Sequence, residues 1–149
     1  MEHLSGETSP EMLEEQIETL EGDDTLRRFW ESRERLAADP YRPLYHFSPP
    51  ENSMTDPKGL CQWNGRYHLF YQFVPENGDR VHWGHTVSDD LVSRRDLPPA
   101  LYPDKENDCF SGQSLVEADR VVAIYHGTQS GNSIATASST CCDREDVWA

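Results

Sequence analysis

The sequence predicts an all-β domain preceded by a helical segment. Before Pro40, apolar residues recur at helical spacing, whereas from Tyr45 onward they alternate with polar residues. Asn64-Gly65, between two such alternating runs, is a strong hairpin signal, because both residues accept the positive φ angles of a type I′ turn. Short, evenly spaced strands are typical of a sandwich, a barrel or a propeller, and the periodicity alone does not choose among them.

Residues 9–38 have the pattern of two helices. Ser9 can cap the first helix, with Pro10 at its first position, and Thr25 can cap the second, which Pro40 ends. Apolar residues line one face of each helix, with Leu13, Ile17 and Leu20 in the first and Leu26, Phe29, Trp30 and Leu36 in the second. We expect residues 1–40 to be an acidic helical leader that packs against the main domain or a partner.

The strands follow from the alternation around the Asn64-Gly65 turn. Strands are predicted at 60–63 and 66–73, and side chains of the second one should point alternately to its two faces. Tyr67, Leu69, Tyr71 and Phe73 then share one face, and His68, Phe70 and Gln72 share the other. Further strands are predicted at 81–88, 114–117, 121–126 and 133–137, with a turn at 117–120.

The charge balance excludes two classes of partner. The 149 residues carry 13 basic and 27 acidic side chains, a formal net charge of −14. Nucleic acids and anionic membranes bind patches of Lys and Arg, so neither is expected as a partner. A saline cytoplasm and a solvated acidic leader both explain the excess acid, since residues 1–24 have nine acidic and no basic residues. With no signal peptide and no membrane-spanning run, we expect a cytoplasmic location.

The cysteines give no sign of a metal or redox site. Cys61, Cys109, Cys141 and Cys142 form no Cys-x-x-Cys pair and have no His at zinc-ligand spacing. We therefore expect buried or idle thiols, no metal and no cofactor.

Four ordered segments carry the chemistry. Asp56-Pro57-Lys58-Gly59 alone indicates a turn, in which the Asp bonds its own backbone. The surrounding motif S-M-T-D-P-K-G is followed by F-Y-Q at 70–72, by W-G-H-T-V-S-D-D-L at 83–91 and by F-S-G-Q at 110–113. In this order and spacing, residues 41–140 resemble glycoside hydrolase family 32, the invertases, inulinases and related β-fructosidases. The family's motifs read W-M-N-D-P-N-G, F-Y-Q, W-G-H-x-x-S-x-D-L and F-S-G-S.

The resemblance implies a fold and a reaction. The fold is a five-bladed β-propeller, of which this chain would hold about the first two blades. The reaction is hydrolysis of sucrose or a fructan with retention, as a β-fructofuranosidase performs it, in which one carboxylate attacks the anomeric carbon and a second acid protonates the leaving oxygen. Asp56 matches the nucleophile. The substrate-binding positions match Thr55, Gln72, Trp83, Phe110 and Ser111. We expect these side chains to converge on one concave surface, although Trp83 and Phe110 could instead pack in a core.

The chain departs from the family pattern in its motifs. Ser53 replaces the Trp, Thr55 replaces an Asn that normally bonds the substrate, Lys58 replaces the second Asn, and Gln113 replaces a Ser. Thr offers a hydroxyl but no amide donor pair, so we expect reduced fructose affinity or an altered substrate.

The family's R-D-P and E-C motifs, which supply a stabilising Asp and the acid Glu, are not found. Five blades need on the order of 200–250 residues, and residues 141–149 form an atypical tail. We therefore expect a truncated or frame-shifted product, inactive alone, that could pair with a chain carrying the missing blades. The alternatives are a non-catalytic fructose-binding or sucrose-binding remnant and an unrelated β domain that serves as an interaction module.

Overall fold

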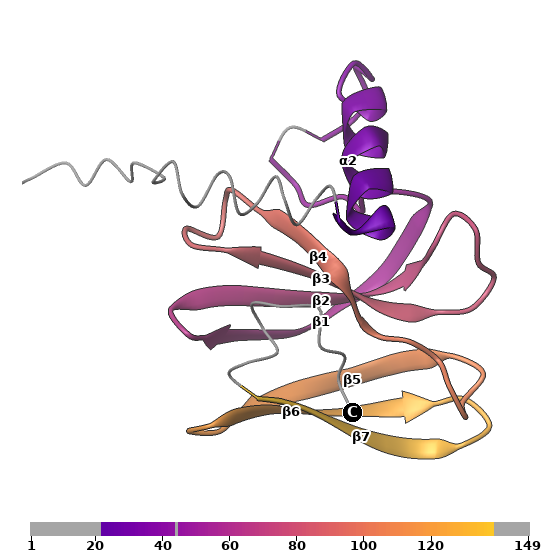
Figure 1. Cartoon of the computed structure of the whole chain (residues 1–149), viewed down its shortest axis with the longest axis vertical. Coiled ribbons are helices and arrows are strands. Elements are labelled where there is room, and N and C mark those ends of the chain that lie inside the picture. The colour runs from indigo at the N-terminus through magenta and orange to yellow at the C-terminus, as the bar shows by residue number, and fades with distance from the viewer. Residues whose placement is uncertain (1–21, 44, 139–149) are drawn as a thin grey trace, which may run out of the picture.

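The computed structural model describes residues 22–43 and 45–138. Within them, one helix precedes seven strands, as the all-β prediction with a helical segment required (Figure 1). The elements are α2 (Asp24–Leu36), β1 (Ser53–Trp63), β2 (Arg66–Val74), β3 (His82–Ser88), β4 (Arg95–Leu101), β5 (Cys109–Val116), β6 (Arg120–Gly127) and β7 (Gly131–Ser138).

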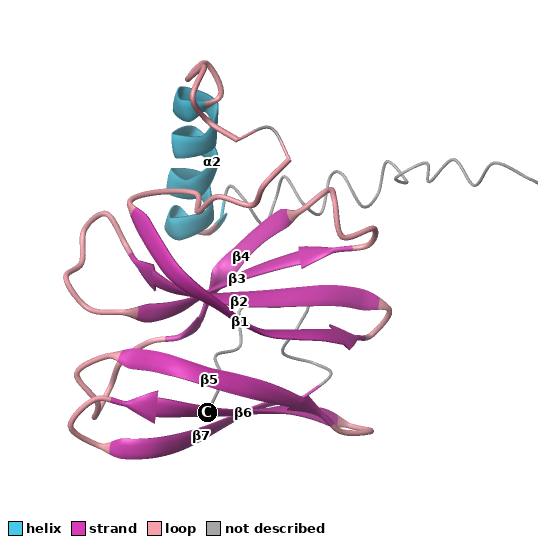
Figure 2. Cartoon of the chain, turned by 180° about the vertical axis from the view of Figure 1, so that it is seen from behind, coloured by secondary structure: helices cyan, strands magenta, loops and turns pink. Residues whose placement is uncertain are grey.

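The strands form two antiparallel sheets. The first sheet has the order β1-β2-β3-β4 and the second has the order β5-β6-β7 (Figure 2). The hairpin at Asn64 and Gly65 is confirmed, with φ angles of 48° and 78°, and the turn at Glu117–Arg120 is closed by a 2.8 Å backbone hydrogen bond. The helix, the first sheet and the second sheet follow one another along the long axis of the molecule.

Three strands differ from the sequence-based prediction. β1 begins at Ser53 rather than at Leu60, and β5 begins at Cys109 rather than at Ser114. In β1, shifts of register between Met54 and Pro57 and between Lys58 and Cys61 let the Asp-Pro-Lys-Gly segment remain within the strand. β4 was not predicted, because Pro98 and Pro99 argue against a strand, but β4 lies at the edge of the first sheet, where proline is tolerated.

A core cluster lies between the two sheets. The centroid of the Trp83 ring lies 5.8 Å from that of Phe70, which is also in the first sheet. It lies 5.7 Å from the centroid of Tyr125, which is in the second sheet. Gly112 permits this approach, because a Cβ there would lie 2.2 Å from the carbonyl oxygen of Ile124 and 2.8 Å from the Trp83 ring. The remaining members are Ala100, Leu101, Cys109, Ala123 and Ala135.

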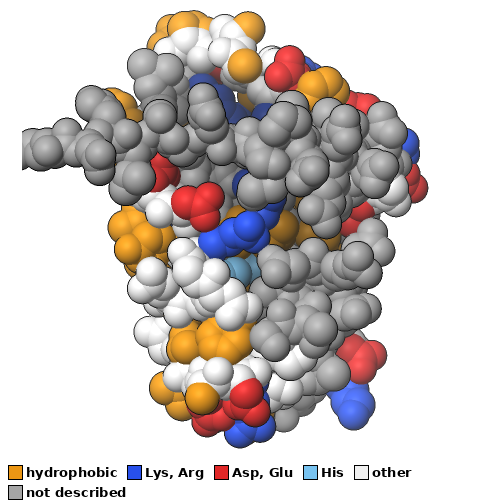
Figure 3. All heavy atoms as spheres, turned by 60° about the vertical axis from the view of Figure 1, so that its left-hand side comes forward, with side chains coloured by type: hydrophobic (Ala, Val, Ile, Leu, Met, Phe, Trp, Pro, Cys, Tyr) orange, Lys and Arg blue, Asp and Glu red, His pale blue; other side chains and the backbone are white. Residues whose placement is uncertain are grey.

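The second sheet exposes apolar side chains on its other face. Ile124 pairs with Ile134 across β6 and β7, and both side chains face the surface together with Leu115 of β5. The second sheet forms one end of the molecule (Figure 1), and Figure 3 shows hydrophobic side chains at the surface of this end. We call Leu115, Ile124 and Ile134 the outer apolar face.

Helix α2 covers the face of the first sheet that points away from the second sheet. Leu26 and Phe29 pack on Tyr71 and Phe73, while Phe70 packs on the opposite side, so the predicted alternation along β2 is confirmed. Phe29 meets Phe73 edge to face at 5.6 Å. The N-cap residue and the apolar face of the helix differ from the prediction. The carboxylate of Asp23 accepts hydrogen bonds from the backbone of Thr25 and Leu26. Trp30, which was predicted on the apolar face, is 55% exposed. Asp23 displaces Thr25 as the cap because its side chain reaches both amides.

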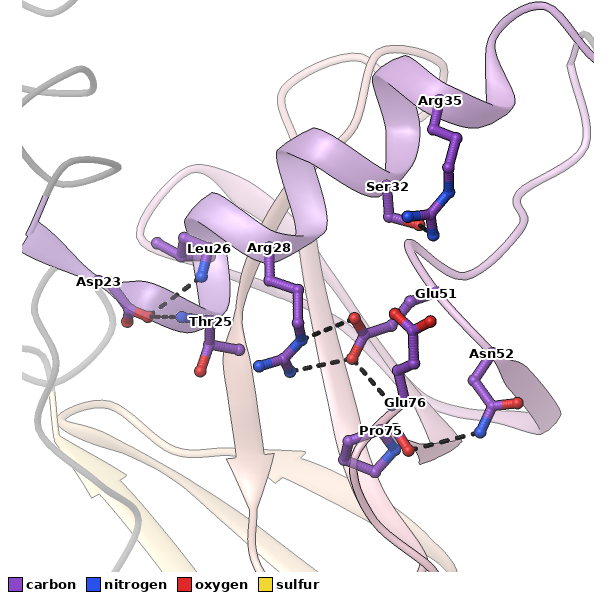
Figure 4. Close-up of polar contacts among 10 residues, drawn as sticks. All are labelled: Asp23, Thr25, Leu26, Arg28, Ser32, Arg35, Glu51, Asn52, Pro75 and Glu76. Atoms are coloured by element: carbon purple, nitrogen blue, oxygen red, sulfur yellow. Dashed lines mark hydrogen bonds and ion pairs between the residues drawn. The ribbon is translucent and has the colours of Figure 1, made fainter.

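Ion pairs between distant residues fix the helix to the sheet. Arg28 donates two hydrogen bonds to Glu51, at 2.8 Å and 2.9 Å, and Glu51 also accepts from the backbone of Glu76 (Figure 4). Arg33 pairs with Asp96 on β4.

The predicted first helix and the tail at 141–149 lie outside the described residues, so the domain limits stay predictions. No described helix has the length and the apolar character that crossing a bilayer demands.

Candidate functional site

Four polar side chains from three strands form one hydrogen-bonded network. Thr55 and Asp56 come from β1, Gln72 from β2 and Ser111 from β5. Ser111 Oγ donates to Asp56 Oδ2 at 2.7 Å, and Gln72 Nε2 donates to the same oxygen at 3.2 Å. Gln72 Nε2 also donates to Ser111 Oγ at 3.0 Å, and Thr55 Oγ1 donates to Gln72 Oε1 at 2.6 Å. We call these residues the Asp56 network.

The backbone of β1 explains how the network is assembled. Gly59 has a φ of +59°, and a Cβ there would lie 2.9 Å from the Phe70 ring, so the position needs glycine. Ser114 Oγ donates to the Gly59 carbonyl oxygen at 2.7 Å, which ties β5 to β1. The sequence thus brings Ser111, three residues earlier on β5, to Asp56 on β1.

The network leaves one oxygen of Asp56 available. Both bonds to Asp56 end on Oδ2, and Oδ1 accepts none from the side chains that the structure describes. Asp56, Thr55 and Ser111 are exposed and Gln72 is half-buried, so the carboxylate faces solvent. Gln72 and Ser111, the two side chains that donate hydrogen bonds to Asp56, are not acids.

Trp83 lies beneath this surface rather than on it. The side chain is 1% exposed, and its Nε1 donates to the carbonyl oxygen of Phe110 at 2.9 Å. The indole therefore supports the backbone next to Ser111, and core packing, the alternative for this residue, describes its place. Phe110 is exposed at the surface, with its ring 6.4 Å from that of His126. The structure brings Asp56, Thr55, Gln72 and Ser111 together, while their roles toward a substrate stay predictions.

Lys58 is a feature that sequence reasoning missed. We noted it as a departure from the family motif, but nothing in the alternation of β1 indicated that its side chain would be 8% exposed. Its ammonium lies 5.1 Å from the centroid of the Trp83 ring. Burial lowers the pKa of Lys58 to about 8, although the negative charge of Asp56 opposes this change.

The described residues include no group of three or more His, Cys, Asp or Glu side chains that could hold a metal ion. Cys61 and Cys109 are free thiols. Burial raises the pKa of Cys109 to about 12, so this thiol is uncharged at neutral pH. Cys141 and Cys142 lie outside the described residues.

A match to a family model identifies the protein family. Residues 46–145 match the model of the glycosyl hydrolases family 32 N-terminal domain. The chain belongs to glycosyl hydrolase family 32. Levanase of Bacillus subtilis is 42% identical over 121 residues, covering 72% of this chain and 18% of the levanase. Sucrose-6-phosphate hydrolase of Escherichia coli is 42% identical over 92 residues, covering 58% of this chain and 19% of that enzyme. The chain spans about a fifth of the length of these curated relatives.

Solved structures of the family agree with the fold. Fructan 1-exohydrolase IIa of Cichorium intybus superposes with a TM-score of 0.62 at 35% identity, covering 74% of this chain and 23% of the enzyme. A β-fructofuranosidase of Bombyx mori gives a TM-score of 0.57 at 34% identity, covering 78% of this chain and 28% of the enzyme. The two sheets are the start of the family's propeller, which confirms the partial-propeller prediction.

Proposed function

We propose that Asp56 is the nucleophile of a retaining β-fructosidase that acts on sucrose or a fructan. The observation that supports this most directly is the geometry of the carboxylate: Ser111 and Gln72 hold Oδ2, Oδ1 takes no hydrogen bond from the described residues, and Asp56 is exposed. Oδ1 would attack the anomeric carbon of a fructosyl unit as the bond to the leaving oxygen breaks. Water would then hydrolyse the fructosyl ester, so that the configuration is retained.

The second carboxyl group is the missing part of this reaction. An alkoxide is a poor leaving group, and general acid catalysis typically contributes about 10²–10⁴-fold. Since neither side chain that bonds Asp56 is an acid, we propose that the acid comes from a part of the propeller outside the described residues. We therefore expect the chain alone to have no appreciable activity on sucrose.

A leaving group that needs no proton separates the nucleophile from the acid. We would incubate the chain with fructofuranosyl fluoride and measure its intact mass, beside an Asp56→Asn variant and a parallel incubation with sucrose. The proposal expects a fructosyl adduct on the chain with the fluoride, none on the variant, and no release of fructose from sucrose. An adduct of equal yield on Asp56→Asn would overturn the role of Asp56. Turnover of sucrose that disappears in the variant would show that the chain does supply an acid. Binding of fructose without any adduct would favour a non-catalytic sugar-binding protein.

We further propose that the outer apolar face packs against the apolar face of another propeller sheet. The two described sheets already pack face to face around Trp83 and Tyr125. Leu115, Ile124 and Ile134 are 59%, 53% and 67% exposed on a contiguous face of the second sheet, and such a face in water favours association.

Complementation tests this pairing. We would mix the chain with a levanase from which the segment matching the two sheets has been deleted, and measure hydrolysis of levan. Activity of the mixture should appear with the wild-type chain and disappear with Ile134→Asp. The control variant Val92→Asp changes an apolar side chain elsewhere that is more exposed than Ile134, and it should retain the activity. Equal activity with Ile134→Asp would exclude the outer apolar face as the pairing surface.

A further inference from the structure

Lys58 is a buried cation in a protein that has few lysines. Its side chain is 8% exposed, and its Nζ has no hydrogen-bond partner among the residues that the structure describes. An ammonium removed from water needs a compensating charge or a polar partner, because desolvation is costly. Among the described residues, Nζ lies over the face of the Trp83 ring, 5.1 Å from its centroid.

The surroundings of Lys58 connect it to the Asp56 network. Lys58 follows Asp56 by two residues on β1, and it is paired with Phe70 in the core between the sheets. The indole under its ammonium holds the Phe110 carbonyl, and the next residue, Ser111, donates to Asp56. The ammonium therefore lies beneath the network, on the same scaffold that positions Ser111.

Two acidic side chains, Asp56 and Cys109, would favour the charged form of Lys58 as anions, but Cys109 is not ionised near neutral pH. The pKa of Lys58 is raised by Asp56 and by Cys109, against the larger effect of burial. Because burial raises the pKa of Cys109 to about 12, its thiol stays protonated while Lys58 titrates. Asp56 remains as the anion whose charge acts on the ammonium.

We propose that Lys58 is a positioning residue for Asp56, a positive charge beneath the network that attracts the carboxylate and keeps it directed at the open surface. This inference rests on the proposed function of Asp56, since a charge partner matters to catalysis only if that carboxylate reacts. A neutral amide at this position, as in the family motif, cannot act in this way. Thr55 and Lys58, which both depart from the family motif, then act on the same network. Thr55 orients the Gln72 amide through its hydrogen bond, and Lys58 supplies a positive charge.

The scarcity of lysine makes a direct test feasible. Lys58 and Lys105 are the only two lysines in the sequence, and Lys105 is exposed. Carbon-13 labelling of lysine therefore gives two ε-carbon signals, which Lys58→Met assigns. The wild-type Lys58 signal should titrate near pH 8. In Asp56→Asn the midpoint should fall by roughly half a pH unit, the size of a charge pair partly screened by water.

A matched variant and a reaction readout complete the experiment. Asp79→Asn removes another exposed acid and should leave the Lys58 midpoint unchanged, and Asp56→Ser serves if Asp56→Asn perturbs the fold. In the fructofuranosyl fluoride reaction, Lys58→Met should slow adduct formation roughly threefold or more, because a carboxylate that is less well positioned attacks less effectively. The wild-type rate should decline above pH 8, and the Lys58→Met rate should not.

The outcomes separate this inference from the proposed function. If neutralising Asp56 leaves the Lys58 midpoint unchanged while the fluoride still labels Asp56, the inference is overturned and the proposed function stands. If the midpoint falls and no adduct forms, the charge pairing is supported and the nucleophile is wrong. If Lys58 titrates together with Lys105, its burial is wrong and so is the inference.

Discussion

The Asp56 network and the contact between α2 and the first sheet hold the same strand region by different means. The network ties β1 to β5 through exposed side chains that exchange short hydrogen bonds with one another. The helix contact holds the segment before β1 through buried groups, with Phe29 2% exposed and Glu51 2% exposed and paired with Arg28. Stability should therefore depend on the helix contact, which leaves the network free for chemistry. The predictions below test this division.

The largest loss of stability is expected for Phe29→Ala. The ring is buried against Phe73, and removing it leaves a cavity between helix and sheet. We expect the free energy of unfolding to fall by about 3–5 kcal/mol, measured by urea denaturation. The neighbouring Trp30→Ala is the control, since Trp30 is exposed and should cost about 0.5 kcal/mol or less. Equal effects of the two variants would mean that α2 does not pack through Phe29.

Arg28→Met should have the next largest effect. Glu51 is buried, and the variant leaves its carboxylate with the amide of Glu76 as its remaining partner. Breaking a buried ion pair from one side costs about 3 kcal/mol at the lower end of the usual range, which is appropriate because Arg28 is partly exposed.

Arg27→Met serves as the matched control for Arg28→Met. Arg27 pairs with Asp24 on the exposed side of the helix, where an ion pair is worth about 0–1 kcal/mol. A comparable loss in the two variants would contradict the special role of the Arg28–Glu51 pair.

A buried histidine pair should make the first sheet sensitive to acid. His85 Nε2 donates to His68 Nδ1 at 3.0 Å, and His68 Nε2 donates to the Trp63 carbonyl oxygen. Burial, with a smaller effect from His68, holds the pKa of His85 well below its usual range. The unfolded chain then binds a proton near pH 6.5 that the folded chain does not. Stability should fall by about 1.4 kcal/mol for each pH unit below 6.5, and it should be independent of this group above that pH.

Denaturation curves between pH 6.5 and 5.5 measure this slope. His85→Gln removes the titrating group and should flatten the dependence, whereas His46→Gln alters an exposed histidine and should leave it as in the wild type. A slope that persists in His85→Gln would assign the acid sensitivity to other groups.

The sequence predicted the network's side of this comparison better than the helix side. Asp56, Gln72 and Ser111 stand in ordered motifs that resemble those of glycosyl hydrolase family 32, and this resemblance predicted that they converge, although Ser111 lies 55 residues from Asp56 and in the other sheet. Arg28 and Glu51 lie 23 residues apart, and Arg33 and Asp96 lie 63 apart, and no periodicity reports which distant charges meet. The same limit applies to Trp83, because a residue in an alternating strand is assigned to a face and not to a depth. Its burial depends on Tyr125 and Gly112 of the second sheet.

The smallest effect is expected within the network itself, and two serines of β5 allow it to be measured. Ser111 and Ser114 each tie β5 to β1 with a 2.7 Å hydrogen bond, to Asp56 Oδ2 and to the Gly59 carbonyl oxygen respectively. Ser111 is exposed, so water can replace its hydroxyl, and Ser111→Ala should change the free energy of unfolding by about 0.5 kcal/mol or less.

Ser114 is half-buried, and Ser114→Ala leaves a backbone carbonyl without its partner, so its cost should be about 1 kcal/mol. Urea denaturation of the two variants under one condition gives this difference directly. If Ser111→Ala costs as much as Ser114→Ala, the Asp56 network stabilises the contact between the two sheets, and stability then depends on more than the helix contact.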